Sequence, residues 1–241
     1  MTVLEKKHLK RTYKTTTKYA FYEKIFNLLG LNYTNKIDAQ INIKNQISKI
    51  NKQTGILGFY NDINSDDIIS GDYNNLPFTV SDVEIYYETN DGRARVFYGL
   101  FLAIKIDKPY KGETIIKTDT FLQTDELKGK NVIKLEDIEF EKYFEVYGTD
   151  QVESRYILTP AFMRRLVDYR KQKYCPIEVV FSNEIGLDKN LFLFVHTGKN
   201  HFELPMDISL LNQDSLYGLI KEITDILDIV DVLKLDQNIG L

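Results

Sequence analysis

The chain has 241 residues, of which 43% are hydrophobic and 27% are charged, so it is long enough and apolar enough to bury a core of its own. These proportions are those of a globular protein and exclude a disordered chain, a collagen-like fibre and a coiled coil. Cys175 is the single cysteine, which excludes an internal disulfide framework and indicates a reducing compartment, the cytoplasm. No apolar run of about 18 residues is present, so we expect no membrane-spanning helix.

The net charge of −4 combines a basic N-terminal segment with an acidic remainder. Residues 1–52 hold eleven Lys or Arg against three Asp or Glu, which leaves a net charge of −12 on the rest of the chain. Such a segment suits an anionic surface, either lipid head groups or nucleic acid. A solvated basic helix without a partner explains the same charges. The residues expected to make an anionic contact are Lys6, Lys7, Lys10, Arg11, Lys14 and Lys18.

The N-terminal part of the chain is predicted to be helical. A helix is expected from Leu4 to Leu29, because apolar residues from Tyr19 onward recur at spacings of three and four, and Gly30 is placed to end it. A weaker period at Ile37, Ile41, Ile47 and Ile50 predicts an irregular or short helical arm that ends near Gly55.

The next part alternates like β-structure. Strands are predicted at residues 67–71, 79–87, 94–106 and 114–117, and together they form an antiparallel meander. Asp91-Gly92 marks a hairpin turn between the second and third strands. The third strand is nearly all apolar in its middle, so we expect it at the centre of a sheet, where Gly99 indicates a bulge or a close approach by another backbone.

The second half mixes both kinds of element. Thr159 and Pro160 suit the N-cap and first position of a helix that ends near Lys173, and an unbroken apolar stripe predicts a helix at residues 214–233. The other predicted features are a surface loop at 123–131 and strands at 132–135, 140–147, 177–182 and 191–195.

The predicted fold class is therefore α+β, with one antiparallel sheet or two, an N-terminal helix, a mid-chain helix after Pro160 and a C-terminal amphipathic helix. Residues 1–30 are predicted to form a basic helical arm and residues 31–241 a single α+β domain. A division of that domain into two subdomains near residues 120–131 is an open alternative.

The polar residues before Pro160 are the best candidates for a binding site. In an extended chain, Glu153 and Arg155 share one face and Asp150 comes within reach, so the guanidinium group is placed to hold a carboxylate or phosphate. A buried Arg–carboxylate bridge that fastens the strand-to-helix junction explains the same residues and is the favoured interpretation. The candidate binding residues are Asp150, Gln151, Glu153, Arg155 and Tyr156.

Motifs of catalysis and cofactor binding are missing from the sequence. It has no nucleophile elbow, zinc-protease motif, Walker loop or dinucleotide-binding glycine motif, so we predict no catalytic residue and no cofactor. His196, His201 and Glu203 loosely resemble metal ligands in spacing, but the set is incomplete and no metal site is predicted. Cys175 follows two lysines but lacks a recognisable base, which favours a structural role.

Two regions carry a resemblance to a known family. Residues 140–160 match F-x-x-x-F-x-V-Y-x-x-D-Q-x-E-x-R-Y-I-L-T-P, and residues 71–101 match a G-x-Y, S-E-V and F-x-G-L-F series in which Asp82 replaces the usual Glu. From Phe21 to Leu235 the chain resembles the bacterial Domain of Unknown Function 3137. The resemblance implies no catalytic residues. Because members of that family often carry a transmembrane hairpin before the conserved domain, it implies either a soluble member or a soluble fragment of a membrane protein.

The main functional hypothesis is a non-catalytic cytoplasmic binding or regulatory module that acts at the inner membrane surface. Its expected partner is an anionic membrane surface or another protein. Nucleic acid is disfavoured, because the body is acidic and lacks a basic stripe with interleaved aromatic residues. The alternative hypothesis is a hydrolase-type enzyme that uses the carboxylate and Arg cluster around Asp150–Arg155.

Overall fold

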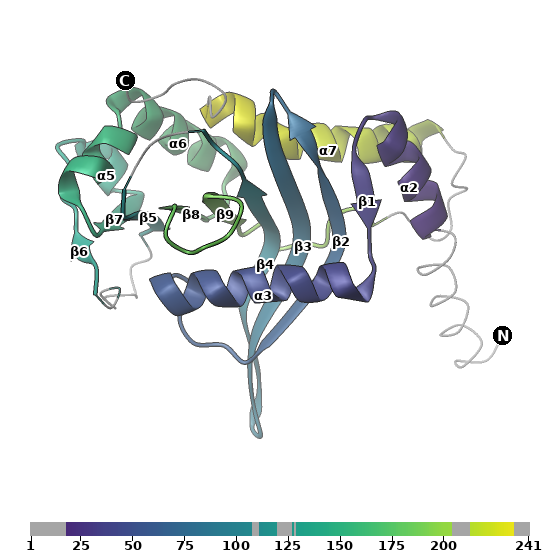
Figure 1. Cartoon of the computed structure of the whole chain (residues 1–241), viewed down its shortest axis with the longest axis horizontal. Coiled ribbons are helices and arrows are strands. Elements are labelled where there is room, and N and C mark those ends of the chain that lie inside the picture. The colour runs from purple at the N-terminus through teal and green to yellow at the C-terminus, as the bar shows by residue number, and fades with distance from the viewer. Residues whose placement is uncertain (1–17, 108–110, 120–126, 128, 204–212, 234–241) are drawn as a thin grey trace.

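In the computed structural model of the protein, a single antiparallel sheet carries helices on both of its faces (Figure 1). The structure describes residues 18–107, 111–119, 127, 129–203 and 213–233. The predicted α+β class is confirmed, and the helices expected near the N-terminus, after Pro160 and near the C-terminus are all present.

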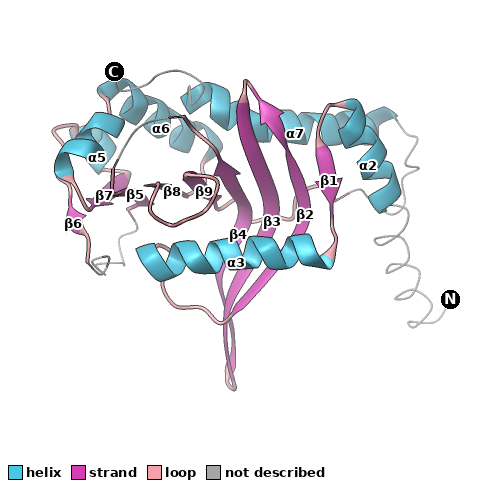
Figure 2. Ribbon diagram, viewed as in Figure 1, coloured by secondary structure: helices cyan, strands magenta, loops and turns pink. Residues whose placement is uncertain are grey.

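Figure 2 distinguishes the helices from the strands. The described helices are α2 (Tyr19–Leu28), α3 (Ile37–Thr54), α4 (Ile138–Glu141), α5 (Gln151–Ile157), α6 (Pro160–Lys173) and α7 (Gln213–Leu233). The described strands are β1 (Asn32–Thr34), β2 (Asp62–Tyr73), β3 (Leu76–Thr89), β4 (Gly92–Ile104), β5 (Glu113–Thr118), β6 (Asn131–Val132), β7 (Phe144–Gly148), β8 (Ile177–Ser182) and β9 (Leu191–Val195).

The strand order of the sheet is β1-β2-β3-β4-β9-β8-β5-β7-β6. The predicted meander holds for β2, β3 and β4, but the placement of β5 beside them was wrong. The β8–β9 hairpin lies between β4 and β5, and β9 pairs with β4 from Leu100 opposite Val195 to Ile104 opposite Leu191. Every residue of β8 and β9 is buried, which explains why this apolar hairpin takes the centre of the sheet. The two predicted β regions therefore form one sheet.

Helix α3 covers one face of the sheet and corrects the prediction of an irregular arm. It is a regular helix of 18 residues, and it ends at Gly55 in the left-handed conformation. Its buried face is Ile43, Gln46, Ile47, Ile50 and Thr54, whereas Ile37 and Ile41 are exposed. The apolar period was weak because two polar residues lie on the buried face and two isoleucines lie off it.

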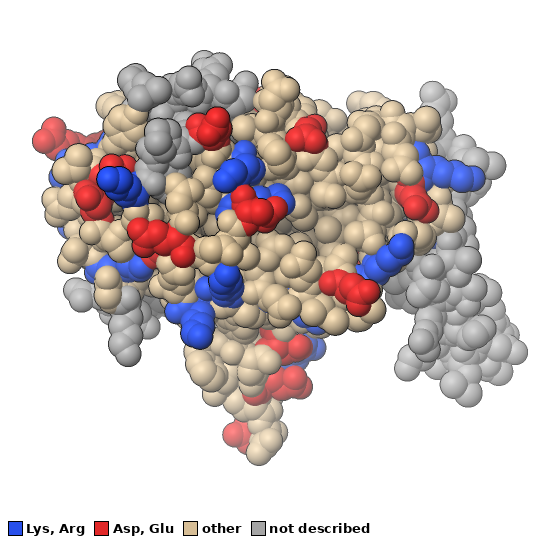
Figure 3. All heavy atoms as spheres, in the orientation of Figure 1, with Lys and Arg blue, Asp and Glu red and all other residues tan. Residues whose placement is uncertain are grey.

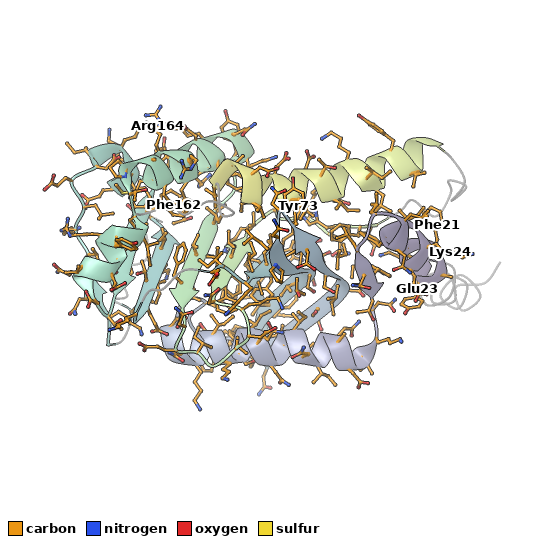
Figure 4. All side chains as sticks on the ribbon, turned by 45° about the horizontal axis from the view of Figure 1, so that its top comes forward. Phe21, Glu23, Lys24, Tyr73, Phe162 and Arg164 are labelled. Carbon is orange, nitrogen blue, oxygen red and sulfur yellow. The ribbon has the colours of Figure 1, made fainter. Side chains whose placement is uncertain are left out.

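The other face of the sheet is covered by α2, α6 and α7, which share one hydrophobic core. Helix α6 begins as its sequence predicts, since Thr159 Oγ1 accepts a hydrogen bond from Phe162 N at 3.3 Å. Phe162 points from α6 into this core, whereas Arg164 points outward (Figure 4). The sheet is thus the middle layer of three, and a partly open cavity lies between it and α6–α7.

Two further predictions of local structure are corrected. The β3–β4 hairpin is present, but Thr89 pairs with Gly92, so its two-residue turn is Asn90-Asp91. The strand expected over residues 140–147 begins only at Phe144, because the Asp137 side chain accepts hydrogen bonds from Glu139 N and Phe140 N and caps the short helix α4 there.

Candidate functional site

A cavity of about 250 Å³ lies between strands β4 and β9 and helices α6 and α7, and we call it the helix–sheet pocket. Leu100, Leu102 and Val195 of the sheet face Ile226 and Ile229 of α7 across it, so its walls are apolar. Polar groups also line it: Tyr169, Lys173, Cys175, Thr197, Lys199, His201, Glu222 and Asp225. Apolar walls with a few polar groups are typical of small-molecule sites.

His201 is the centre of a hydrogen-bonded network in this pocket. Its Nδ1 lies 2.8 Å from Glu222 Oε1 on α7, and its Nε2 lies 2.7 Å from Thr197 Oγ1. Glu222 Oε2 also accepts the Phe202 backbone N–H at 2.9 Å. Hydrogen bonds from His201 and Phe202 hold the pKa of Glu222 below its ordinary value, although burial opposes them. The network ties the segment after β9 to the helix that closes the pocket.

Gly99 lets the segment that follows β9 pack directly against the backbone of β4. A Cβ at Gly99 would meet Val195 O and, at 2.7 Å, Thr197 N. The predicted close approach of another backbone to Gly99 is therefore correct. The Gly198 N–H reinforces the contact by donating to Tyr98 O at 3.0 Å.

Lys173 and Cys175 lie at the C-terminal end of α6, on the wall of the same pocket. Burial raises the pKa of the Cys175 thiol, although Arg170 and Lys173 lower it. A raised pKa lowers the fraction of the reactive thiolate form. Lys173 makes no ion pair within 4 Å with any residue that the structure describes.

A second cavity, of about 320 Å³, is lined by carboxylate, amide and hydroxyl groups, and we call it the acidic pocket. Its lining residues are Gln40, Asn64, Ser65, Asp66, Asp82, Val83, Glu84 and Asn200. Asp82 Oδ2 accepts the His201 N–H at 2.8 Å, whereas the buried Asp82 Oδ1 has no hydrogen-bond partner among the described residues. Burial, followed by the charges of Asp67, Asp66 and Glu84, raises the pKa of Asp82 to about 7 against the hydrogen bond from His201.

A β-bulge beside the acidic pocket turns Asp67 into the interior. The pairing of β2 with β3 shifts between Asp66 and Ile68, and Asp67 takes a positive φ of 45°. Asp67 Oδ2 lies 2.7 Å from Lys18 Nζ, and its Oδ1 accepts a hydrogen bond from Tyr33. Burial raises the pKa of Asp67 to about 6, although Lys18 opposes this.

The surface role expected for Lys18 is corrected by this ion pair. The side chain of Lys18 is only 2% exposed, and its Nζ also lies 3.3 Å from Glu203 Oε1. The other residues of the expected anionic contact, Lys6, Lys7, Lys10, Arg11 and Lys14, lie outside the described residues. On the face of the molecule in Figure 3, basic and acidic side chains are interspersed.

Of the five residues predicted around Asp150, Arg155 lines a cavity of about 640 Å³ with Glu136 and Asp137, and the other four are not among its lining residues. Residues 151–157 form helix α5, so Glu153 and Arg155 point about 200° apart instead of sharing one face. Asp150 caps this helix by accepting hydrogen bonds from Val152 N and Glu153 N, and Arg155 donates to Lys134 O at 2.6 Å. Gln151 and Tyr156 are exposed. Arg155 is exposed and donates to a backbone carbonyl, so the buried Arg–carboxylate bridge is not found among the described residues, whereas the ligand site around these residues stays a prediction.

From the sequence, His201 was expected to be a partly solvated loop histidine and not a metal ligand, but it is buried and pairs with Glu222. The two residues are 21 positions apart, and no motif links a loop histidine to a carboxylate on the last helix. The helical nature of 151–157 was accessible, because Asp150 followed three residues later by Glu153 is a helix-start signal.

The fold and the two pockets define an α+β protein with one antiparallel sheet, helices on both faces and no recognised active-site motif. The family described as "Protein of unknown function (DUF3137)" matches residues 95–235, and the chain belongs to this family. The resemblance seen at residues 140–160 is thereby confirmed. All residues that line the helix–sheet pocket fall within the matched range, whereas those of the acidic pocket, apart from Asn200, precede it.

The chain is also similar to a solved structure, that of the mycobacterial trehalose monomycolate transport factor A, TtfA. The two are 12% identical, the match covers 89% of this chain and 96% of that chain, and the TM-score is 0.43. A TM-score this low does not establish a common fold, so nothing about this chain follows from it. No curated protein matches the sequence. Among the described helices, none combines the length and the apolar character needed to cross a bilayer.

Proposed function

We propose that this protein is a non-catalytic binding module, and that its ligand is a small molecule with an apolar body and one acidic group. The ligand would lie in the helix–sheet pocket, with its apolar body against Leu100, Val195 and Ile226. The single observation that carries this proposal is the position of Lys173, a cation on the wall of a mainly apolar cavity whose charge is not neutralised by an ion pair with any described residue.

The charges around the pocket favour an acidic ligand over a basic one. The acidic groups already have cationic or hydrogen-bonding partners. Glu222 is hydrogen-bonded to His201, and Asp225 Oδ2 lies 2.6 Å from Lys221 Nζ. Lys173 is therefore the charge most available to a ligand, and an ammonium gains most from a partner in a partly desolvated site.

The size of the pocket limits the ligand. Sites for drug-sized molecules span about 300–1,000 Å³. At about 250 Å³ the pocket lies just below this range, so it suits a short-chain acid better than a complete lipid.

Cys175 provides a direct test, because it is the single cysteine and lies on the pocket wall. The rate at which iodoacetamide alkylates it would be measured by intact-protein mass in the presence of octanoate, octanol or octylamine. We expect octanoate to slow the reaction at least fivefold, octanol less, and octylamine least. Equal rates with and without all three compounds would refute the proposal.

Two variants of α6 separate charge from packing. In Lys173→Met, octanoate is expected to lose its advantage over octanol, because the cation that favours the carboxylate is gone. Lys171→Met is the matched control, since Lys171 lies two residues away and pairs with Glu139 outside the pocket. Lys173 also lowers the pKa of Cys175, so each rate is compared with that of the same variant without ligand.

We further propose that the module is cytoplasmic and works at the inner membrane surface, with the basic residues near the N-terminus in contact with anionic lipid. The support is the charge of residues 1–52, which hold eleven Lys or Arg and three acidic residues. Flotation with vesicles of phosphatidylglycerol at low and high salt tests this contact. Binding that persists after residues 1–17 are removed would contradict it.

A hydrolase is the second candidate function, and a specific geometry favours it. Thr197, His201 and Glu222 lie in the order hydroxyl, imidazole, carboxylate, at the distances of a nucleophile triad. Thr197 Oγ would attack an ester carbonyl while His201 takes its proton and then protonates the leaving alcohol. This candidate ranks second because the neighbouring amides are occupied: Thr197 N donates to Val195 O and Gly198 N to Tyr98 O, so neither is free to stabilise an oxyanion. Hydrolysis of p-nitrophenyl butyrate that is lost in Thr197→Val would reverse this order.

A further inference from the structure

Tyr169 is a buried tyrosine of helix α6, and its hydroxyl makes no hydrogen bond with any residue that the structure describes. The residue is only 5% exposed. It follows Phe162 by seven residues, about two helical turns, so it lies on the face of α6 that points into the core (Figure 4). Buried tyrosine hydroxyls in folded proteins nearly always have a partner, so the missing one calls for an explanation.

The hydroxyl of Tyr169 opens into the helix–sheet pocket. The residue lines this pocket, and its oxygen is not among the fully enclosed polar atoms that lack a partner in the described part of the chain. Burial, followed by the charges of Cys175, Asp228 and Asp225, raises the pKa of this hydroxyl, and two of these three residues lie on the same pocket wall. The O–H group therefore stays protonated and can donate a hydrogen bond into the cavity.

Lys173 provides a second donor beside this hydroxyl. It follows Tyr169 by four residues on α6, and side chains at this spacing are neighbours on one face of a helix. Both residues line the helix–sheet pocket, and neither has an ion pair or hydrogen bond with a described residue. A phenol O–H and an ammonium group side by side can each donate to one oxygen of a carboxylate.

The nearest acidic group on the pocket wall, Asp225, has other partners. Its Oδ2 lies 2.6 Å from Lys221 Nζ. Lys221, followed by Lys173 and Lys199, holds the pKa of Asp225 below its ordinary value. More than one cation therefore balances this carboxylate, and the two donors on α6 are left to a ligand.

We propose that Tyr169 is a ligand-binding residue of the helix–sheet pocket, and that its hydroxyl and the Lys173 ammonium bind the two oxygens of one ligand carboxylate. This inference rests on the binding function proposed above, and it narrows the acidic group of the ligand to a carboxylate. Two adjacent donors match the two oxygens of that group, whereas an alcohol offers only one oxygen. The apolar body of the ligand remains against Leu100, Val195 and Ile226.

Calorimetry with octanoate and 2-nonanone separates the two donors, because the ketone oxygen accepts a hydrogen bond but carries no charge. In Tyr169→Phe we expect the Kd of octanoate to rise about tenfold, as for the loss of a hydrogen bond to a charged group, and that of 2-nonanone to rise severalfold. In Lys173→Met only the Kd of octanoate should rise. Tyr143→Phe is the matched control, because it removes the same hydroxyl from a tyrosine outside the pocket and should leave both Kd values unchanged.

Carbon-13 NMR of octanoate labelled at its carboxyl carbon tests the contact directly. A carboxylate that accepts hydrogen bonds and pairs with a cation titrates at a lower pH than the free acid. The bound resonance should therefore keep its ionised chemical shift to a lower pH than that of free octanoate. The difference should shrink in Tyr169→Phe, whereas a change of packing alone would not move it.

The outcomes separate this inference from the function on which it rests. If octanoate binds the original protein, but its Kd and its carboxyl titration are the same in Tyr169→Phe, the inference is overturned and the proposed function stands. If octanoate does not bind the original protein, both fail. Because the hydroxyl has no described partner to lose, the thermal transition of Tyr169→Phe should match that of the original protein. A clearly lower transition would reveal a structural hydrogen bond and would also overturn the inference.

Discussion

The backbone N–H of His201 donates a 2.8 Å hydrogen bond to Asp82 Oδ2, and this bond connects the helix–sheet pocket with the acidic pocket. The imidazole of His201 lines the helix–sheet pocket, while the carboxylate of Asp82 lines the acidic pocket. One residue of the segment after β9 therefore contacts both sites. Any change in the charge of Asp82 acts directly on the backbone that holds His201 against Glu222.

Asp82 should make the stability of the protein depend on pH near neutrality. Its folded pKa of about 7 is raised above its ordinary value of 3.8, so the folded state keeps this proton when the unfolded chain has lost it. The free energy of unfolding therefore falls as the pH rises from about 4 to 7. For this group alone we expect a loss of about 2 kcal/mol between about pH 5.5 and 7.5, measured by urea denaturation.

Asp82→Asn tests this assignment. In this variant the free energy of unfolding should depend much less on pH above pH 6. Below pH 6 the dependence that Asp67 causes should remain, because its pKa is raised to about 6. The charged groups that face Asp82 are Asp66 and Asp67 from β2 and Glu84 from β3, and all three remain in the variant. An unchanged slope in Asp82→Asn would show that another group is responsible.

Removal of Lys18 should be strongly destabilising. Both side chains of the Lys18–Asp67 pair are 2% exposed, and breaking a buried pair costs about 3–5 kcal/mol because the remaining charge is left without a partner. We expect Lys18→Met to lower the free energy of unfolding by about 3 kcal/mol at pH 8. The loss should be smaller at pH 5, where Asp67 is protonated.

The double variant Lys18→Met/Asp67→Asn is the control for this pair. It removes both charges and keeps an acceptor for the Tyr33 hydroxyl, so it should recover most of the stability that the single variant loses. Equal stability of the single and double variants in urea would indicate lost packing instead of an unpaired charge.

Two glycine-to-alanine variants should change the free energy of unfolding in opposite directions. Gly99→Ala brings a Cβ against Val195 O and Thr197 N, both backbone atoms, and should cost about 3 kcal/mol. In Gly218→Ala, within helix α7, the added Cβ has no atom within 4 Å. This variant should raise the free energy of unfolding by about 0.5–1 kcal/mol. Thermal denaturation of both variants measures these effects. A stabilised Gly99→Ala protein would contradict the close approach of the chain after β9.

Asp150→Ala should affect stability and not ligand binding. The Asp150 side chain caps α5, so its loss should lower the free energy of unfolding by about 1 kcal/mol. Serine can also cap a helix, so Asp150→Ser should keep most of the stability of the original protein. The protection of Cys175 by octanoate should be the same in both variants, because Asp150 does not line the helix–sheet pocket. Lost protection in Asp150→Ala would restore the site predicted around Arg155.

Local signals in the sequence determined the α+β class, the start of α6 at Thr159-Pro160, the stripe of α7 and the buried hairpin of β8 and β9. Each of these depends on residues close together in the chain, where capping, periodicity and burial act directly. The same signals also identified Gly99 as a place of close approach, but not the residues that approach it.

Only the tertiary structure decided where β9 lies and which polar side chains meet. Its pairing with β4 joins residues about ninety positions apart, and this pairing places Thr197 and His201 beside Glu222. Lys18 and Asp67 are likewise 49 positions apart, and the bulge that turns Asp67 inward has no sequence signature of its own. Both pockets arise from contacts between distant segments, and such contacts follow from packing the whole sheet between its two helical layers, which local patterns do not encode.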